Sequence, residues 1–116
     1  MADSFRDLQV WQRAIQMSLA IYRLTSGFPK EELYGLTSQM RRAGVSVASN
    51  IAEGYGRMST GEYKQFLGMA RGSNSEVQTQ LVIARELGYG NQQVLQDSES
   101  FSFEVGKMQL AILRTL

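Results

Sequence analysis

The chain has 116 residues, a formal net charge of +1 at pH 7, and neither cysteine nor histidine. This length predicts a single domain, residues 1–116, with a core of its own. The missing residue types exclude a disulfide scaffold, thiol chemistry, the commonest metal ligand and the commonest acid or base at neutral pH.

Glycine and proline residues divide the chain into four segments whose apolar residues recur at helical spacing. The expected helices are residues 7–26, 30–54, 59–88 and 91–114. Gly27 and Pro29 end the first helix, and Ser59 with Glu62 spells a capping box at the start of the third. Four helices joined by short turns predict an all-α fold, an up-down-up-down four-helix bundle.

The first helix carries two apolar stripes, although a bundle helix needs only one. The stripe predicted to face the core, with its aromatic side chains as packing residues, is Leu8, Trp11, Ile15, Leu19 and Tyr22. The second stripe is rotated from it by about 100° and consists of Val10, Ala14, Met17, Ile21 and Leu24. Because surplus apolar surface tends to be a contact site, this second stripe is the candidate oligomer interface. A wide core face is the alternative.

The second helix places small and polar residues where a bundle core is normally apolar. Ser46 and Asn50 lie on or beside the stripe that includes Val47 and Ile51. Buried polar groups need hydrogen-bond partners, or they cost about 1–3 kcal/mol each. The sequence therefore predicts a structural polar network of Arg42, Ser46, Asn50, Glu53, Ser73 and Glu76. In this network Arg41 or Arg42 pairs with a carboxylate such as Glu53 or Glu76, or these carboxylates pair with their helix neighbours. A ligand site is the alternative.

Basic residues concentrate in the middle of the chain. Residues 37–72 carry a net charge of +3, and residues 73–116 carry −2. Nine of the twelve basic residues are arginine, which binds phosphate through two parallel hydrogen bonds and stacks on bases. The candidate nucleic-acid-binding residues are Arg41, Arg42, Arg57, Lys64 and Arg71. Ordinary solvated charges are the alternative interpretation.

Several short sequence motifs in a fixed order carry a family resemblance. They are Phe5-x-x-Leu8-x-Val10-Trp11-Gln12-x-Ala14, Tyr34-Gly35-Leu36-Thr37-Ser38-Gln39-Met40-Arg41-Arg42-Ala43, Ser49-Asn50-Ile51-Ala52-Glu53-Gly54 and Gly72-Ser73-x-x-Glu76. With them the chain resembles the four-helix-bundle family encoded by intervening sequences of bacterial 23S ribosomal RNA genes, the 23S rRNA-intervening-sequence proteins. The resemblance weakens after Tyr89. The chain also departs from the family pattern at two positions: Ala48, where many members have proline, and Asn74, where an apolar residue is common.

The resemblance implies an assembly and a ligand. Members of the family form homopentamers, so it implies a ring of five bundles around a central axis. It extends to the accessory variability proteins of diversity-generating retroelements, which are pentamers that bind a reverse transcriptase and nucleic acid. It therefore implies that a basic surface of the ring binds structured RNA, ribosomal RNA included, or other nucleic acid.

Two classes of function remain open. The chain has no nucleophile–base pair and no metal-ligand set, so we expect a non-enzymatic protein without a metal or cofactor. It is either an oligomeric nucleic-acid-binding protein or a ring-shaped module that docks a protein partner and has no nucleic-acid role of its own. The two differ at one point: burial of both Arg41 and Arg42 against Glu53 would remove much of the nucleic-acid surface.

The lengths of the apolar runs also give an expectation for the cellular location. All are shorter than the roughly 20 residues that cross a bilayer, and the first residues lack the basic-then-apolar pattern of a signal peptide. We therefore expect a cytoplasmic protein with no membrane partner.

Overall fold

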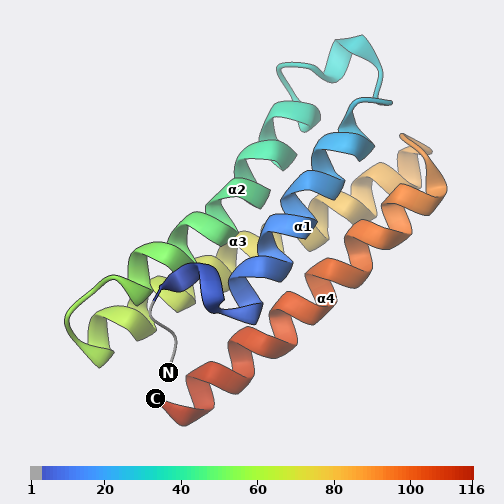
Figure 1. Ribbon diagram of the computed structural model, residues 1–116. Helices are drawn as coiled ribbons and strands as arrows, with labels where there is room; N and C mark the ends of the chain where they lie inside the picture. Colours follow the sequence, from blue (N-terminus) through green and yellow to red (C-terminus); the bar gives the residue numbers. More distant parts are fainter. Residues whose placement is uncertain (1–3) are drawn as a thin grey trace.

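The computed structural model of the chain describes residues 4–116, which form four long α-helices and no strand. The helices are α1 (Gln9–Thr25), α2 (Leu36–Tyr55), α3 (Thr60–Leu87) and α4 (Gln92–Thr115). They lie side by side along a body of 43 × 24 × 21 Å, with the start of α1 and the end of α4 at the same end of the bundle (Figure 1). α1 and α3 each pack against both α2 and α4. Within residues 4–116, no helix is both long and apolar enough to cross a membrane.

The second helix begins later than expected. Residues 30–32 form a short 3₁₀ helix, η2 (Lys30–Glu32), and the α-helix starts only at Leu36. Gly35 separates the two with a backbone that is neither helical nor extended (φ −113°, ψ −114°). A Cβ at this position would lie 2.8 Å from Oε1 of Glu32, the atom that accepts a hydrogen bond from the Leu36 N–H. Glycine thus leaves room for Glu32 to satisfy a free amide at the start of α2.

Both stripes of α1 contribute to the core of the subunit, which agrees with the alternative of a wide core face. Val10, Ala14, Met17, Ile21 and Leu24 are all buried inside the subunit. Because these side chains are covered within a single subunit, their assignment to the oligomer interface is wrong. The stripe predicted to be core is the outer one, with Leu19 54% exposed and Tyr22 43% exposed. Leu8, Trp11 and Ile15 cover the rim of the core.

Small side chains explain which stripe of α1 faces inward. A Cβ added at Gly44 of α2 would lie 3.0 Å from Cδ1 of Ile21 and 3.7 Å from the Cα of Ser18, so α1 and α2 approach closely here. The stripe that contains Ala14 fits such a contact, whereas an aromatic stripe would hold the helices apart. Trp11 instead packs beside the core against Phe5 of a short 3₁₀ helix, η1 (Phe5–Asp7), with ring centroids 5.2 Å apart.

A buried polar pair joins α3 to α4. Ser102 Oγ donates to Asn74 Oδ1 at 2.7 Å, and Asn74 Nδ2 donates to the backbone oxygen of Ser102 at 3.0 Å. Asn74 is only 3% exposed and Ser102 is fully buried. The core is therefore polar at position 74, as the departure from the family pattern suggested, and both side chains are satisfied.

Gln109 of α4 is buried without such a partner. Its side chain is fully buried, and neither Nε2 nor Oε1 has a hydrogen-bond partner among residues 4–116. An unsatisfied buried amide costs more than the apolar group of the same shape, so Gln109→Met should raise the free energy of unfolding by about 1–2 kcal/mol. Urea denaturation at fixed protein concentration measures the change. The matched exposed change on the same helix, Gln96→Met, should have little effect. A loss of stability in Gln109→Met would contradict this account.

Candidate functional site

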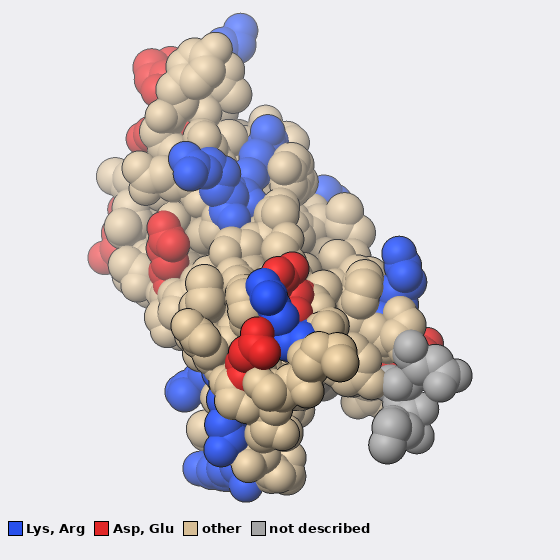
Figure 2. All heavy atoms as spheres, turned by 90° about the vertical axis from the view of Figure 1, so that its left-hand side faces the viewer, with Lys and Arg blue, Asp and Glu red and all other residues tan. Residues whose placement is uncertain are grey.

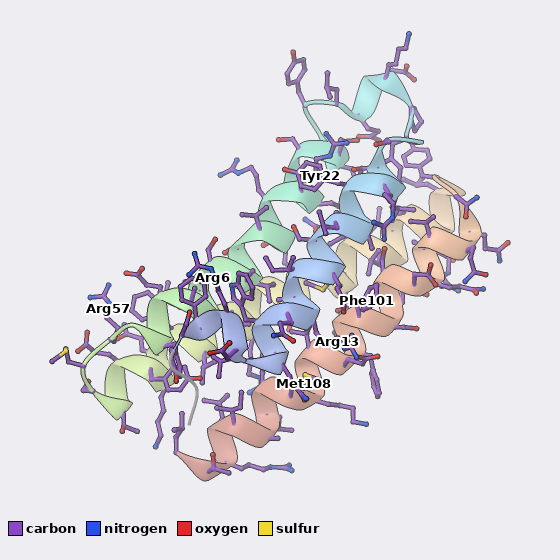
Figure 3. The ribbon with its side chains drawn as sticks, viewed as in Figure 1. Arg6, Arg13, Tyr22, Arg57, Phe101 and Met108 are labelled. Carbon is purple, nitrogen blue, oxygen red and sulfur yellow. The ribbon has the colours of Figure 1, made fainter. Side chains whose placement is uncertain are left out.

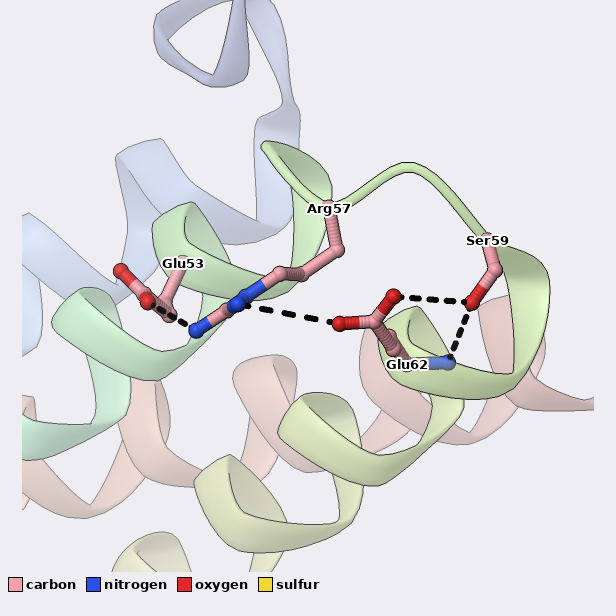
Figure 4. A network of polar contacts seen from close by, with 4 residues as sticks. All are labelled: Glu53, Arg57, Ser59 and Glu62. Atoms are coloured by element: carbon pink, nitrogen blue, oxygen red, sulfur yellow. Dashed lines mark hydrogen bonds and ion pairs between the residues drawn. The ribbon is translucent and has the colours of Figure 1, made fainter.

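Arg57, the candidate in the turn between α2 and α3, is held by two carboxylates. Its Nη2 lies 2.6 Å from Oε1 of Glu53, and its Nη1 lies 3.7 Å from Oε2 of Glu62 (Figure 4). The guanidinium also covers the ring of Phe66, 4.8 Å from its centroid. Because two neighbouring negative charges offset its own, Arg57 offers little net attraction to a phosphate.

The start of α3 explains why Glu62 lies within reach of Arg57. Ser59 Oγ accepts a hydrogen bond from the Glu62 backbone N–H at 3.2 Å and donates to the Glu62 carboxylate at 3.2 Å. The capping box predicted from the sequence is thus confirmed in its Ser59 to Glu62 contact. The box holds Glu62 at the end of the bundle where the chain turns from α2 into α3.

A small polar cluster lies between α2 and α3. The Oγ atoms of Ser46 and Ser73 are 3.0 Å apart, and Asn50 Nδ2 donates to the backbone oxygen of Ser46 at 2.9 Å. These residues were three of the six predicted members of the structural network. They satisfy one another within the subunit and contribute to helix packing.

The three charged members of that predicted network behave differently. Glu53 pairs with Arg57, four residues further along the chain, and not with Arg41 or Arg42. Eleven residues separate Glu53 from Arg42 on one helix, which at 1.5 Å per residue is about 16 Å. Arg42 and Glu76 both line a hollow of ≈ 310 Å³ between α2 and α3, and within residues 4–116 no ion pair joins them.

Arg41 is fixed against α1. Its Nε donates to Thr25 Oγ1 at 2.9 Å, and its guanidinium stacks on Tyr22, 4.7 Å from the ring centroid. Thr25 Oγ1 in turn donates to the backbone oxygen of Ile21 at 2.8 Å. The terminal nitrogens of Arg41 have no partner among the described residues. The side chain is therefore oriented while two of its donor groups remain available.

Arg41 and Arg42 share an open hollow of ≈ 650 Å³ at the end of the bundle near η2. Its lining residues are Tyr22, Leu33, Tyr34, Thr37, Ser38, Arg41, Arg42, Val45 and Ser46. The lining contains two arginines and two tyrosines but no carboxylate. Arg42 is exposed and also lines the neighbouring hollow beside Glu76. The combination of cationic and aromatic side chains suits a ligand with both negative charge and a flat ring.

The turn between α3 and α4 contacts η2, next to two residues that line this hollow. Tyr89, in the turn between α3 and α4, donates its hydroxyl to Glu32 Oε2 at 3.2 Å, and its ring packs on Phe28 with centroids 5.3 Å apart. Partial burial, followed by the Glu32 hydrogen bond and charge, raises the pKa of Tyr89 above its ordinary value. Through its two carboxylate oxygens Glu32 therefore connects Tyr89 to the start of α2, next to Leu33 and Tyr34.

Lys64 and Arg71 lie elsewhere on α3. Ser73 faces α2 through its contact with Ser46. At 100° per residue, Arg71 is rotated by about 200° from Ser73 and therefore points away from the hollows beside α2. Lys64 is seven residues earlier, so it shares the face of Arg71. Both are exposed, and neither has a partner among residues 4–116.

The five predicted cations thus form three groups instead of one surface. Arg41 and Arg42 meet at the larger hollow, Arg57 lies near the opposite end of the bundle from Tyr22 (Figure 3), and Lys64 and Arg71 occupy the far flank of α3. On the face shown in Figure 2, basic side chains form separate clusters with acidic side chains between them. The charge surplus of residues 37–72 does not produce a continuous basic patch.

Sequence reasoning missed the aromatic part of the site. Tyr22 was assigned to core packing, yet it is exposed and lines the hollow beside Arg41. Tyr34 is 93% exposed and was not a candidate at all. Its position immediately before Gly35, in a turn between two helical segments, was the available signal, since exposed aromatic residues in turns are often functional.

The profile of the family described as 23S rRNA-intervening sequence protein matches residues 6–111. The chain belongs to this family. The predicted family resemblance is therefore confirmed, and the match includes both α1 stripes, the hollow and the α2–α3 turn. No curated protein matches the chain with significant similarity.

A solved structure supports the fold of the chain. It is the crystal structure of a protein of unknown function from the S23 ribosomal protein family of Bacteroides thetaiotaomicron. The two share 19% identity with a TM-score of 0.81 over 90% of this chain and 97% of that one. At this identity the comparison establishes a common all-helical fold.

Proposed function

We propose that the chain is a non-enzymatic, nucleic-acid-binding protein that contacts phosphate groups through Arg41 and Arg42. One observation carries the proposal: the larger hollow brings together two arginines and two tyrosines with no carboxylate in its lining. Arginine is the side chain best suited to grip phosphate with paired donors. Neither Arg41 nor Arg42 is paired with Glu53. Burial of both against Glu53 would have removed much of the nucleic-acid surface, so its absence favours nucleic acid over a protein-docking module.

The family description makes structured RNA the first ligand to test. It associates the family with intervening sequences of 23S rRNA. Phosphate contacts of this kind position a nucleic acid without reading its sequence. We therefore expect affinity for ribosomal RNA fragments that depends on salt more than on base sequence.

We further propose that the protein acts as a homo-oligomer of up-down-up-down bundles, with the pentamer implied by the family resemblance as the expected state. Support comes from large apolar side chains left on the surface, among them Leu19 on α1 and Val82 and Leu87 on α3. Repetition of the hollow around a ring would multiply a modest attraction for RNA. Native mass spectrometry counts the subunits.

A protein-docking module is the second candidate. The lining of the larger hollow favours it, because tyrosine and arginine side chains are also enriched where proteins bind other proteins. A protein partner and a nucleic acid differ in their dependence on salt. Binding through released counterions weakens steeply as salt rises.

The test compares two exposed arginines on helices. Fluorescence anisotropy with a labelled 23S rRNA fragment, over a salt series, should show binding that weakens with salt. Arg42→Gln should lower the affinity at least about tenfold, because a hydrogen bond to a charged group is lost, and should flatten the salt dependence. Arg71→Gln, the charge-matched control, should change it much less. Equal losses in both variants, or no binding at low salt, would contradict the proposal.

A further inference from the structure

We infer that the larger hollow holds an unpaired nucleotide, with its base on Tyr34 and its phosphate at Arg42. This inference rests on the proposed function and adds to it the form of nucleic acid that is bound. The hollow measures ≈ 650 Å³, within the roughly 300–1,000 Å³ typical of small-ligand sites. It is thus large enough for a flat base.

Tyr34 is the residue that selects an unpaired base. Its ring is 93% exposed in the turn between η2 and α2, and it lines the hollow together with Arg42. Both faces of an exposed ring are open to a stacking partner, whereas Arg41 already occupies one face of Tyr22. In a duplex the bases are stacked on one another and cannot reach a tyrosine. An exposed ring beside an arginine is the arrangement with which proteins bind single strands.

The turn that carries Tyr34 is held before any ligand arrives. Glu32 bonds to the Leu36 N–H on one side and accepts from the Tyr89 hydroxyl on the other. Tyr89 belongs to the α3–α4 turn, so the connection spans the end of the bundle. Leu33 and Val45 add apolar surface to the same hollow, which suits the edges of a base or a ribose. Less conformational freedom is therefore lost when a base stacks on Tyr34.

The experiment measures fluorescence anisotropy with a labelled single-stranded RNA oligonucleotide and with the same strand annealed to its complement, on the full-length protein at one salt concentration. We expect the single strand to bind more tightly. Tyr34→Ala should weaken single-strand binding about tenfold, as loss of one stacked base does, and leave duplex binding unchanged. Tyr34→Phe should retain the affinity, since the ring does the stacking. Phe103→Ala removes a ring that is 65% exposed on α4 and does not line the hollow, and is the control.

The outcomes separate this inference from the proposed function. Equal binding of single strand and duplex, with Arg42→Gln weakening both and Tyr34→Ala neither, would overturn the inference and leave the proposed function intact. Absence of binding to either RNA would overturn both. Far-UV circular dichroism and denaturation of the Tyr34 variants verify that they fold, which is expected of a change at an exposed turn.

Discussion

Gly54→Ala should lower the free energy of unfolding by about 3 kcal/mol, at the upper end of what overpacking a core costs. Gly54 is buried where α2 meets the start of α3, and a Cβ there would lie 2.7 Å from the Cβ of Phe66. A Cβ cannot move away by side-chain rotation, so the two helices would have to separate. The same added atom would lie 3.4 Å from the backbone oxygen of Tyr63. Urea denaturation followed by circular dichroism measures the loss.

A second glycine provides the matched control. Gly72 lies in the middle of α3, is exposed, and has nothing within 4 Å of an added Cβ. Alanine is about 1 kcal/mol better than glycine in a helix interior, so Gly72→Ala should stabilise the protein. Protein concentration is held equal, since the stability of an oligomer depends on it. If Gly54→Ala proved as stable as Gly72→Ala, the close contact of α2 with α3 would be disproved.

Asn74→Asp should destabilise the protein by about 3 kcal/mol at pH 7, because it places an unpaired charge in the core. The new carboxylate would face the backbone oxygen of Ser102, to which Asn74 now donates. Burial should raise the pKa of this carboxyl above its unfolded value, so the folded state binds the proton more tightly. The full loss in the free energy of unfolding is therefore present above the raised pKa of the folded state. It shrinks as the pH falls toward the unfolded-state pKa of about 4.

The control for this charge is the same substitution at an exposed position. Asn91 caps α4, and its Oδ1 accepts a hydrogen bond from the Val94 N–H at 3.1 Å. Aspartate serves equally well as an N-cap, so Asn91→Asp should change stability little at any pH. A loss in Asn74→Asp that is the same at pH 4 and pH 7 would show that packing, and not charge, is responsible.

Much of the fold could be predicted from local sequence signals. Gly27 with Pro29, and Ser59 with Glu62, act within a few residues, and the helices end or begin close to them. The start of α2 was missed because Pro29 and the acidic residues after it also fit the start of a helix. The interruption at Gly35 depends on where the Glu32 side chain goes, which sequence spacing alone does not reveal.

Tertiary packing decided what the sequence left open. Two apolar stripes of similar strength on α1 cannot be ranked by periodicity, and the small residue Gly44 on another helix determines that Ala14 and Ile21 face inward. The candidate site likewise depends on packing between elements that are separate in the sequence. Arg42 was found because the charge of its segment is visible in the sequence. Tyr34 was not found, since it lines the same hollow as Arg42 only once the turn between η2 and α2 has formed.

Photochemical cross-linking of a 4-thiouridine-labelled 23S rRNA fragment, mapped by mass spectrometry on the oligomer, tests the central claim most directly. If RNA is bound at the hollow of Arg41 and Arg42, cross-links should fall on the peptides that contain Tyr22 and Tyr34, and Arg42→Gln should reduce them. Cross-links confined to the flank of Lys64 and Arg71 would contradict the account.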